Sequence, residues 1–474
     1  MIDSTEFRRH AHTFVEWMAD YLENVGEMPV KSKAGPGDIL KQLPDNPPDE
    51  GEPMDRIFED FRQIILPGMT HWQSPNFFAY FTANSSYPSI LAEMLTSTMA
   101  AQCMVWETSP AAAELEEKVL NWLRDMIGLP GFFEGVIQDS ASTATLVALL
   151  TARERNTSYR INEVGFQART YFRIYCSSEA HSSIEKAVKM AGFGRRALVK
   201  VECDETLAIN PASLRQCIKD DISDGYIPLC VVAALGTTGT LAIDPLEPLA
   251  EICREYDLWL HVDAAFAGTA LVLPEYRWMI KGIEQVDSFV FNPHKWMFTN
   301  FDCSAYFVRD TDALIKTFEI LPEYLKTGTR GKVKDYRDWG VQLGRRFRAL
   351  KLWFVIRDYG VEGIRRKVQD HIAWARELAN QIRSEPGFEL LDPQHLSLVC
   401  FRYRPDNVKS ADDIDAANMT LMQHLNESGQ LYLTHTRVGG LVTLRMVVAQ
   451  THVTREHVQA AWKEIREMAH ALEI

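Results

Sequence analysis

Two spacings of apolar residues alternate along the chain. Near the N-terminus, apolar positions recur every three or four residues, which predicts an amphipathic helix over residues 4–26 and a second over 54–66. Between these helices, Pro29 to Pro53 is rich in proline and glycine and indicates an extended connector. Residues 1–85 have too little sequence to enclose their own core, so we expect them to pack on another body, such as a partner subunit.

From residue 86 the pattern changes to short apolar runs of strand length that alternate with helical segments. The predicted strands cover residues 171–176, 197–201, 229–235, 258–262, 288–292 and 304–308. The predicted helices cover 111–127, 144–153, 182–191, 211–219, 246–256 and 341–358. This alternation is typical of a mostly parallel sheet with helices on both faces.

The last part of the chain indicates a smaller α+β domain. Its predicted helices are 361–384, 411–427 and 454–472, and its strands are 388–391, 398–403, 431–436 and 441–448. We therefore expect an N-terminal helical dimerisation segment at 1–85, a large α/β domain at 86–350 and a small C-terminal domain at 351–474.

Polar residues with useful chemistry follow the predicted strands, where α/β sheets bind ligands. Residues 258–262 lead into Asp263, and 288–292 lead into Lys295. A lysine after a buried strand is partly desolvated, and its neutral amine can attack a carbonyl to form a Schiff base. An acid at a neighbouring strand end can keep a pyridine nitrogen protonated. Together they meet the needs of pyridoxal 5'-phosphate (PLP).

Either residue alone would more often be an ordinary solvated charge. The functional interpretation gains weight because His181 and Thr238 also follow predicted strands and Asn292 ends one. Small hydroxyl residues at 140–143 precede a helix, where free backbone N–H groups and the helix dipole favour a phosphate. Serine and threonine are also ordinary helix caps, so this signal is weak by itself.

Two further stretches have two readings each. The aromatic run from His71 to Phe81 could be a core plug or one wall of an aromatic pocket. Residues 326–335 contain few apolar side chains and two glycines, and they follow Tyr324. They could form a mobile lid over a site or a plain exposed linker.

Composition narrows the classes of partner and compartment. The 474 residues are 46% hydrophobic and carry a net charge of −14 with no long basic run, so nucleic acid is not expected as a partner. Eight cysteines without CxxC or zinc-type spacing indicate free thiols in a reducing compartment and no metal site. With no signal-peptide pattern and no apolar run long enough for a membrane, we expect a soluble cytoplasmic protein.

With these residues in place, the chain resembles the group II PLP-dependent decarboxylases, specifically the aromatic-L-amino-acid decarboxylases, over almost its full length. The matching motifs are Ser74-Pro75, Phe77–Phe81, Ser85–Pro88, Ala180–Ser183, Leu235–Thr238, His261–Ala265, Asn292–Trp296, Asn300–Ser304 and Gly344–Arg348. The resemblance implies the aspartate-aminotransferase-type (type I) PLP fold and an obligate homodimer with active sites at the subunit interface.

The resemblance also implies a role for each matching residue. Lys295 would hold PLP covalently, Asp263 would pair with the ring nitrogen, and His181 would stack on the ring. The other implied cofactor contacts are Ala265 on the opposite ring face, Ser140, Ala141, Asn292 and His294 at the phosphate, and Thr238 near the cofactor and substrate carboxylate. The implied aromatic substrate pocket comprises Trp72, Tyr80, Phe81, Ala83, Met104, Phe301 and Gly344, with Met104 and the Phe301 side coming from the other subunit.

Tyr324 would protonate the substrate Cα after CO2 leaves. Relatives with phenylalanine at the position of Tyr324, or asparagine at that of His181, resemble oxidative aldehyde synthases. This chain has both Tyr324 and His181, so the resemblance implies decarboxylation of tryptophan, phenylalanine, tyrosine or dopa to the arylalkylamine. The alternatives are an aldehyde synthase, a histidine decarboxylase and a non-catalytic binding relative.

Several positions depart from the family pattern or refine the substrate. Glycine at position 344 goes with pockets that accept an indole ring, whereas serine goes with smaller rings, including histidine. Ala83 replaces a catechol-binding threonine, which makes dopa a less favourable substrate by on the order of 1 kcal/mol. Met104 replaces an aromatic pocket residue with a more adaptable one. Asp139 replaces the glycine before Ser140.

Overall fold

The computed structural model describes residues 2–167, 171–320, 332–391, 396–405 and 410–472. The chain folds into two compact units. The first, which we call the terminal unit, comprises residues 1–82, 374–391 and 399–474. The second, the central unit, comprises residues 83–373 and 392–398. Both ends of the chain therefore contribute to one unit.

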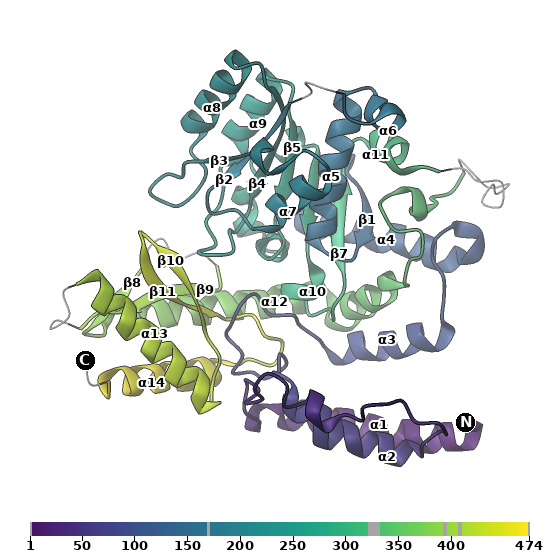
Figure 1. The fold of residues 1–474 in the computed structure, drawn as a ribbon, viewed down its shortest axis with the longest axis vertical. Coiled ribbons are helices and arrows are strands. Elements are labelled where there is room, and N and C mark those ends of the chain that lie inside the picture. The colour runs from purple at the N-terminus through teal and green to yellow at the C-terminus, as the bar shows by residue number, and fades with distance from the viewer. Residues whose placement is uncertain (1, 168–170, 321–331, 392–395, 406–409, 473–474) are drawn as a thin grey trace. The chain divides into compact units, whose positions relative to one another are not determined.

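The central unit is built on a seven-stranded sheet (Figure 1). In spatial order its strands are β1 (Glu134–Gln138), β7 (Ser304–Val308), β6 (Ser288–Phe291), β5 (Trp259–Asp263), β4 (Ile227–Ala234), β2 (Phe172–Ser177) and β3 (Leu198–Val201). Neighbouring strands run parallel, except that β7 is antiparallel to both β6 and β1. The predicted mostly parallel sheet is confirmed, and β1 is an additional strand that the apolar pattern did not reveal.

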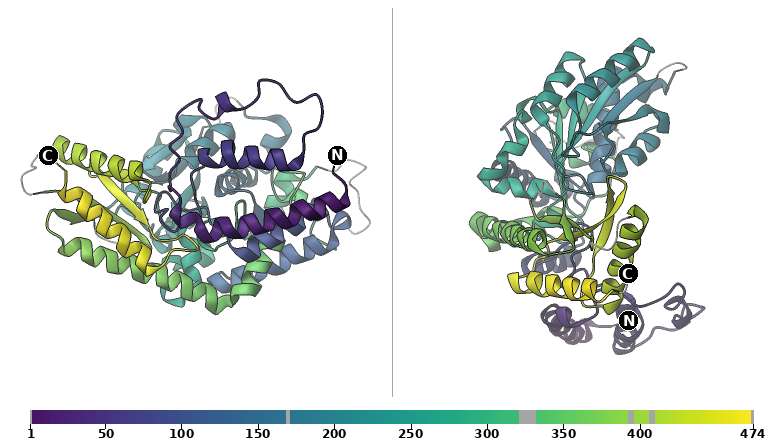
Figure 2. Two further views of the ribbon diagram at one scale, coloured as in Figure 1. Left: turned by 90° about the horizontal axis from the view of Figure 1, so that it is seen from below. Right: turned by 90° about the vertical axis from the view of Figure 1, so that its left-hand side faces the viewer.

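Helices cover the faces of this sheet (Figures 1 and 2). The helices of the central unit are α3 (Tyr87–Met99), α4 (Pro110–Ile127), α5 (Ala141–Asn156), α6 (Arg160–Val164), α7 (Ser183–Met190), α8 (Pro211–Ser223), α9 (Leu246–Glu255), α10 (Pro293–Trp296), α11 (Thr311–Phe318) and the first part of α12 (Arg348–Ser384). Helices α7 and α11 each pack on α5, and α8 packs on α9. The predicted βα alternation is confirmed.

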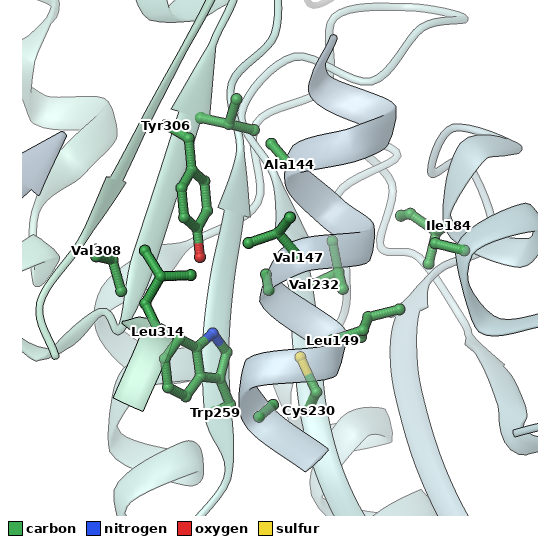
Figure 3. Packing of buried hydrophobic residues seen from close by; sticks show 14 of the residues in the cluster. Ala144, Val147, Leu149, Ile184, Cys230, Val232, Trp259, Tyr306, Val308 and Leu314 are labelled. Carbon is green, nitrogen blue, oxygen red and sulfur yellow. The ribbon is translucent and has the colours of Figure 1, made fainter. Parts of the chain in front are cut away.

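Side chains on alternate strand positions face α5 and form the core in Figure 3. Cys230 and Val232 of β4, Trp259 of β5 and Tyr306 of β7 are buried there against Val147. Because successive strand residues point to opposite faces, Trp259 and Asp263, the first and last residues of β5, point to the same face of the sheet. The core therefore determines which face of the sheet carries Asp263.

The long helix α12 begins at Arg348, seven residues later than predicted. The preceding segment is held in a non-helical path, because the Gln102 side chain accepts from the backbone N–H of Arg345 (2.8 Å) and the Arg345 carbonyl accepts from the N–H of Cys103 (3.0 Å). Gly360, with φ of 63°, interrupts α12 within the expected break between 358 and 361.

The terminal unit joins the two ends of the chain. Its elements are α1 (Ser4–Asn24), α2 (Met54–Asp60), α13 (Ala411–Ser428), α14 (Arg455–His470) and a four-stranded sheet in the order β10 (Thr434–Val438), β11 (Leu441–Val447), β9 (Leu398–Tyr403) and β8 (Phe388–Leu390). Strand β10 starts three residues later than predicted. The backbone of Tyr432 is bonded instead to Asn76 (3.2 Å) and Phe78 (3.0 Å).

We expect Leu149→Ala to destabilise the protein by about 2–5 kcal/mol, because Leu149 of α5 is fully buried and truncation leaves a cavity. Urea denaturation followed by circular dichroism measures the loss. As a control, Met190→Ala at the exposed end of α7 should change the free energy of unfolding by less than about 0.5 kcal/mol. Equal losses in the two variants would contradict the assigned core.

Candidate active site

Lys295 lies on the single turn of α10, directly after β6. Its backbone N–H donates to the carbonyl of Asn292 (2.9 Å), and the Asn84 side chain donates to the Lys295 carbonyl. The backbone N–H of Asn84 also donates to the carbonyl of His294 (3.1 Å). Removal from water lowers the pKa of Lys295, while the nearby Asp263 carboxylate opposes that shift. This is the direction predicted for a nucleophilic amine.

Asp263 ends β5, the strand next to β6. Its Oδ1 accepts the backbone N–H of Ala265 (3.0 Å), and the Ala265 carbonyl accepts the N–H of Asn292 (3.0 Å). These two bonds connect the ends of the two strands. Asp263 thus lies in a fixed turn, within electrostatic reach of both Lys295 and His181.

A buried histidine lies behind Asp263 on the same strand. His261 is fully buried, and its Nδ1 lies 2.9 Å from Oγ of Ser288, which also accepts from Nε1 of Trp259 (2.9 Å). Burial lowers the pKa of His261 to about 4, although Asp263 favours the charged ring. His261 is therefore neutral at pH 7, and Asp263 gains no counter-ion from it.

His181 follows β2, and its ring Nδ1 accepts the backbone N–H of Ser183 (3.1 Å). An accepting Nδ1 leaves the proton of the neutral ring on Nε2. Partial desolvation is the main cause of the lowered pKa of His181. Asp263 opposes the shift and Lys295 adds to it. His181 as a residue is exposed to solvent in the isolated chain.

The N-terminus of α5 forms an anion cradle at the same edge of the sheet. Oγ of Ser140 caps the helix by accepting the N–H of Thr143 (3.3 Å). In the described chain, the backbone N–H groups of Ala141 and Ser142 make no hydrogen bond, as expected for a first helical turn. This sixteen-residue helix therefore presents free donors and its positive dipole end.

Asn292 and His294 follow β6, which ends at the same edge of the sheet as β1 and is separated from it by β7. Oγ of Ser304 donates to Oδ1 of Asn292 (2.7 Å), and Nδ1 of His294 accepts the backbone N–H of Cys303 (2.8 Å). Burial lowers the pKa of His294 to about 3, so its neutral ring carries the proton on Nε2. The ring of Phe301, which is largely exposed, lies 4.6 Å from that of His294.

Besides Phe301, three of the predicted substrate residues belong to irregular segments of the central unit. The carbonyl of Met104 accepts the N–H of Arg337 (2.9 Å), which fixes its backbone. A side chain at Gly344 would meet the Nε2 of Gln102 at 3.3 Å. Ala83 is half-buried beside Asn84. Thr238 is exposed after β4. Gln102 and Asn84 were not singled out from the sequence, because their roles depend on long-range backbone contacts.

The remaining predicted pocket residues, Trp72, Tyr80 and Phe81, lie in the terminal unit. There they contact other aromatic rings and a cation. The Trp72 and Tyr80 rings stack at 5.8 Å, and the hydroxyls of Tyr80 and Tyr432 lie 3.3 Å apart. Arg445 lies over the ring of Phe81 at 5.4 Å. Tyr432 and Arg445 were missed from the sequence, since each lies more than 300 residues from its partner. Tyr324 lies outside the described residues.

Within the ranges described above, no helix is both long and apolar enough to cross a bilayer. The same residues contain no cluster of three or more histidine, cysteine or acidic side chains suited to a metal ion.

Comparison with known proteins identifies relatives along the whole chain. The family model described as the pyridoxal-dependent decarboxylase conserved domain matches residues 36–404. A tyrosine decarboxylase 4 of Petroselinum crispum is 38% identical, with 99% of this chain and 94% of that protein covered. A phenylacetaldehyde synthase of Arabidopsis thaliana is 40% identical, with 99% and 96% covered.

Solved structures agree with these matches. The crystal structure of Oryza sativa TDC with PLP and tryptamine is 36% identical in sequence. It superimposes with a TM-score of 0.96 and covers 99% of this chain and 98% of its own.

We expect the buried imidazole of His261 to make the free energy of unfolding decrease as the pH is lowered. The unfolded chain binds its proton with a pKa near 6.5 and the folded chain with one of about 4, so the unfolded state binds more protons between these values. The contribution of neutral His261 to the free energy of unfolding is therefore fully present above pH 6.5 and is lost as the pH falls towards 4. Between pH 7 and pH 5 this loss should amount to about 2 kcal/mol. Urea denaturation at both pH values should therefore show a smaller loss for His261→Asn than for the parent. Equal losses would refute the assignment.

Proposed function

The chain belongs to the family of pyridoxal-dependent decarboxylases, and from this premise we propose that it converts an aromatic L-amino acid to the arylalkylamine and CO2. The observation that carries the proposal is the meeting of Lys295, Asp263 and His181 at one edge of the sheet, with a lowered lysine pKa. The names of the relatives support an aromatic substrate: a tyrosine decarboxylase, a TDC structure with tryptamine and a phenylacetaldehyde synthase.

The donor set fits PLP. The amine of Lys295 suits the cofactor's aldehyde, the carboxylate of Asp263 suits its ring nitrogen, and the α5 cradle suits its phosphate. We propose that Ser140, Ala141, Asn292 and His294 hold the phosphate. When bound, PLP supplies an electron-accepting ring that takes up the electron pair released as CO2 leaves.

The protein's own groups prepare that chemistry. Asp263 keeps a proton on the ring nitrogen, and this role requires the carboxylate to stay ionised without a closer cation. Because His261 is neutral and buried, it offers the carboxylate no competing positive charge. We propose that His181 lies against one ring face and Ala265 against the other. We also propose that Thr238 contacts the substrate carboxylate.

Tyr324 is proposed as the residue that returns a proton to the substrate Cα. A phenol with a pKa near 10 is a weak acid, but the substrate carbon that has lost CO2 and accepts the proton is a much stronger base. This assignment rests on the family resemblance, since Tyr324 lies outside the described residues. The proposed ring pocket comprises Trp72, Tyr80, Phe81, Ala83, Met104, Phe301 and Gly344.

We propose that the protein acts as a homodimer with active sites at the interface. One face of α3 supports this proposal, because it exposes apolar side chains at helical spacing: Tyr87, Leu91, Met94, Leu95 and Met99. Met104 and Phe301 would then line the partner's pocket. A cytoplasmic location is also proposed, supported by eight cysteines that are all free thiols.

The second candidate function is aldehyde synthesis. The 40% identity to a phenylacetaldehyde synthase favours it, whereas Tyr324 and His181 favour amine formation. In aldehyde synthesis the amino acid, O2 and water yield the aldehyde, CO2, ammonia and hydrogen peroxide. Product analysis therefore separates the two functions.

We expect the parent enzyme to release one amine for each CO2 from tryptophan, phenylalanine or tyrosine. Tyr324→Phe should lower amine formation by about a hundredfold or more and divert product to aldehyde, because the proton donor is lost. Chromatography of amine and aldehyde, with a peroxide assay, measures both. Lys295→Ala should give neither product. An unchanged amine yield in Tyr324→Phe would rule out the proton-donor role, and stoichiometric peroxide from the parent would favour the synthase.

Gly344→Ser should lower kcat/KM for tryptophan by about tenfold more than for phenylalanine, because the added side chain fills space that an indole ring needs. At Gly131, where an added Cβ meets nothing within 4 Å, the same substitution should leave both values unchanged. Steady-state kinetics with the two substrates provide the comparison. A parallel fall for both substrates would show that Gly344 does not select the ring.

A further inference from the structure

An acidic residue lies inside the proposed phosphate cradle. Asp139 connects the end of β1 to Ser140, the cap of α5, and is half-buried. Oγ of Ser140 donates to Oδ1 of Asp139 (3.1 Å). The hydroxyl expected to serve the cofactor phosphate is therefore engaged by a carboxylate.

The geometry brings two anions close together. The Ser140 hydroxyl has one proton, which it can donate either to Asp139 or to a phosphate, and a phosphate within reach of this hydroxyl lies about two hydrogen-bond lengths from the carboxylate. Arg348 is a cation within electrostatic reach of Asp139, but its guanidinium donates two 3.0 Å bonds to the carboxylate of Asp302. The negative charge of Asp139 is thus incompletely balanced and opposes a dianionic phosphate.

The same carboxylate has a second partner. Nε2 of Gln342 donates to Oδ2 of Asp139 (2.7 Å). One residue earlier, Nε2 of Gln138 donates to the carbonyl of Trp339 (3.1 Å). Both bonds tie the end of β1 to residues 339–345, which we call the Gly344 segment. Asp139 therefore connects the phosphate cradle to the segment that carries the proposed ring-selecting glycine.

We propose that Asp139 is a positioning residue that anchors the Gly344 segment through Gln342 and, by its charge, weakens retention of the cofactor phosphate. This inference rests on the proposed function, since it presupposes PLP in the α5 cradle. The backbone of Asp139 lies outside the left-handed region, so asparagine can replace aspartate there without backbone strain. Asparagine also keeps an oxygen acceptor for Gln342 while removing the charge.

The test compares holoenzymes of the parent, Asp139→Asn and Asp139→Gly. Each is diluted, equilibrated and separated from free cofactor by ultrafiltration, and protein-bound PLP is quantified. Loss of the charge should lower the apparent Kd for PLP by about tenfold in both variants. The Kd of pyridoxal, which lacks the phosphate, should be the same in the parent and in Asp139→Asn.

Two control variants separate the effect of the Asp139 charge from the effect of its hydrogen bond to Gln342. Gln342→Ala removes the hydrogen bond but keeps the carboxylate, so it should not tighten PLP retention. Asp312→Asn removes one surface carboxylate on α11, which follows the antiparallel β7 and so begins at the opposite edge of the sheet. It should leave retention unchanged.

Three results would overturn the inference: no gain in PLP retention for Asp139→Asn, an equal gain for pyridoxal, or an equal gain in Gln342→Ala. None of these would refute decarboxylation. A parent protein that carries no PLP at all would instead refute the proposed function.

Discussion

The desolvation of Lys295 beside the carboxylate of Asp263 is the constraint on which the rest of the site depends. Burial lowers the lysine pKa and thereby favours the nucleophilic amine, while Asp263 prevents the shift from going further. The carboxylate of Asp263 can counteract the effect of burial on Lys295 only because β5 and β6 are parallel neighbours that end at the same edge. Sheet register thus sets an electrostatic balance that neither strand could set alone.

Burial also decides the charge of the surrounding imidazoles. His261 and His294 have pKa values of about 4 and 3, mainly because each ring is removed from water. The Nδ1 atom of His294 accepts a backbone N–H, which leaves an N–H donor on the opposite ring nitrogen. Neutral rings can donate hydrogen bonds to a phosphate or support Asp263 without adding a positive charge that would compete for that carboxylate.

Much of this arrangement could be predicted from the sequence, because strand-length apolar runs ending in Asp263 and Lys295 are local signals. For the same reason β7 was predicted with its observed bounds, and β6 was predicted only one residue too long at its end. The start of α12 was not, since a hydrogen bond from Arg345 to Gln102, 243 residues earlier, holds the preceding segment out of the helix. Tyr432 was missed because its own backbone pairs with Asn76 and Phe78, more than 300 residues earlier in the chain. Contacts of this range leave no periodic signal in a single sequence.

The residues proposed for the cofactor and those proposed for ring selection differ in how the fold holds them. Residues proposed for the cofactor follow strands of one sheet, so moving any of them would disturb the register and the core beneath. Met104 and Gly344 instead lie on irregular segments joined by a few hydrogen bonds, such as Met104 carbonyl to Arg337 N–H. A substitution there can reshape the pocket at little cost to the sheet. One scaffold can therefore serve phenol, phenyl and indole rings, as the names of its relatives suggest, while Lys295 and Asp263 keep their geometry.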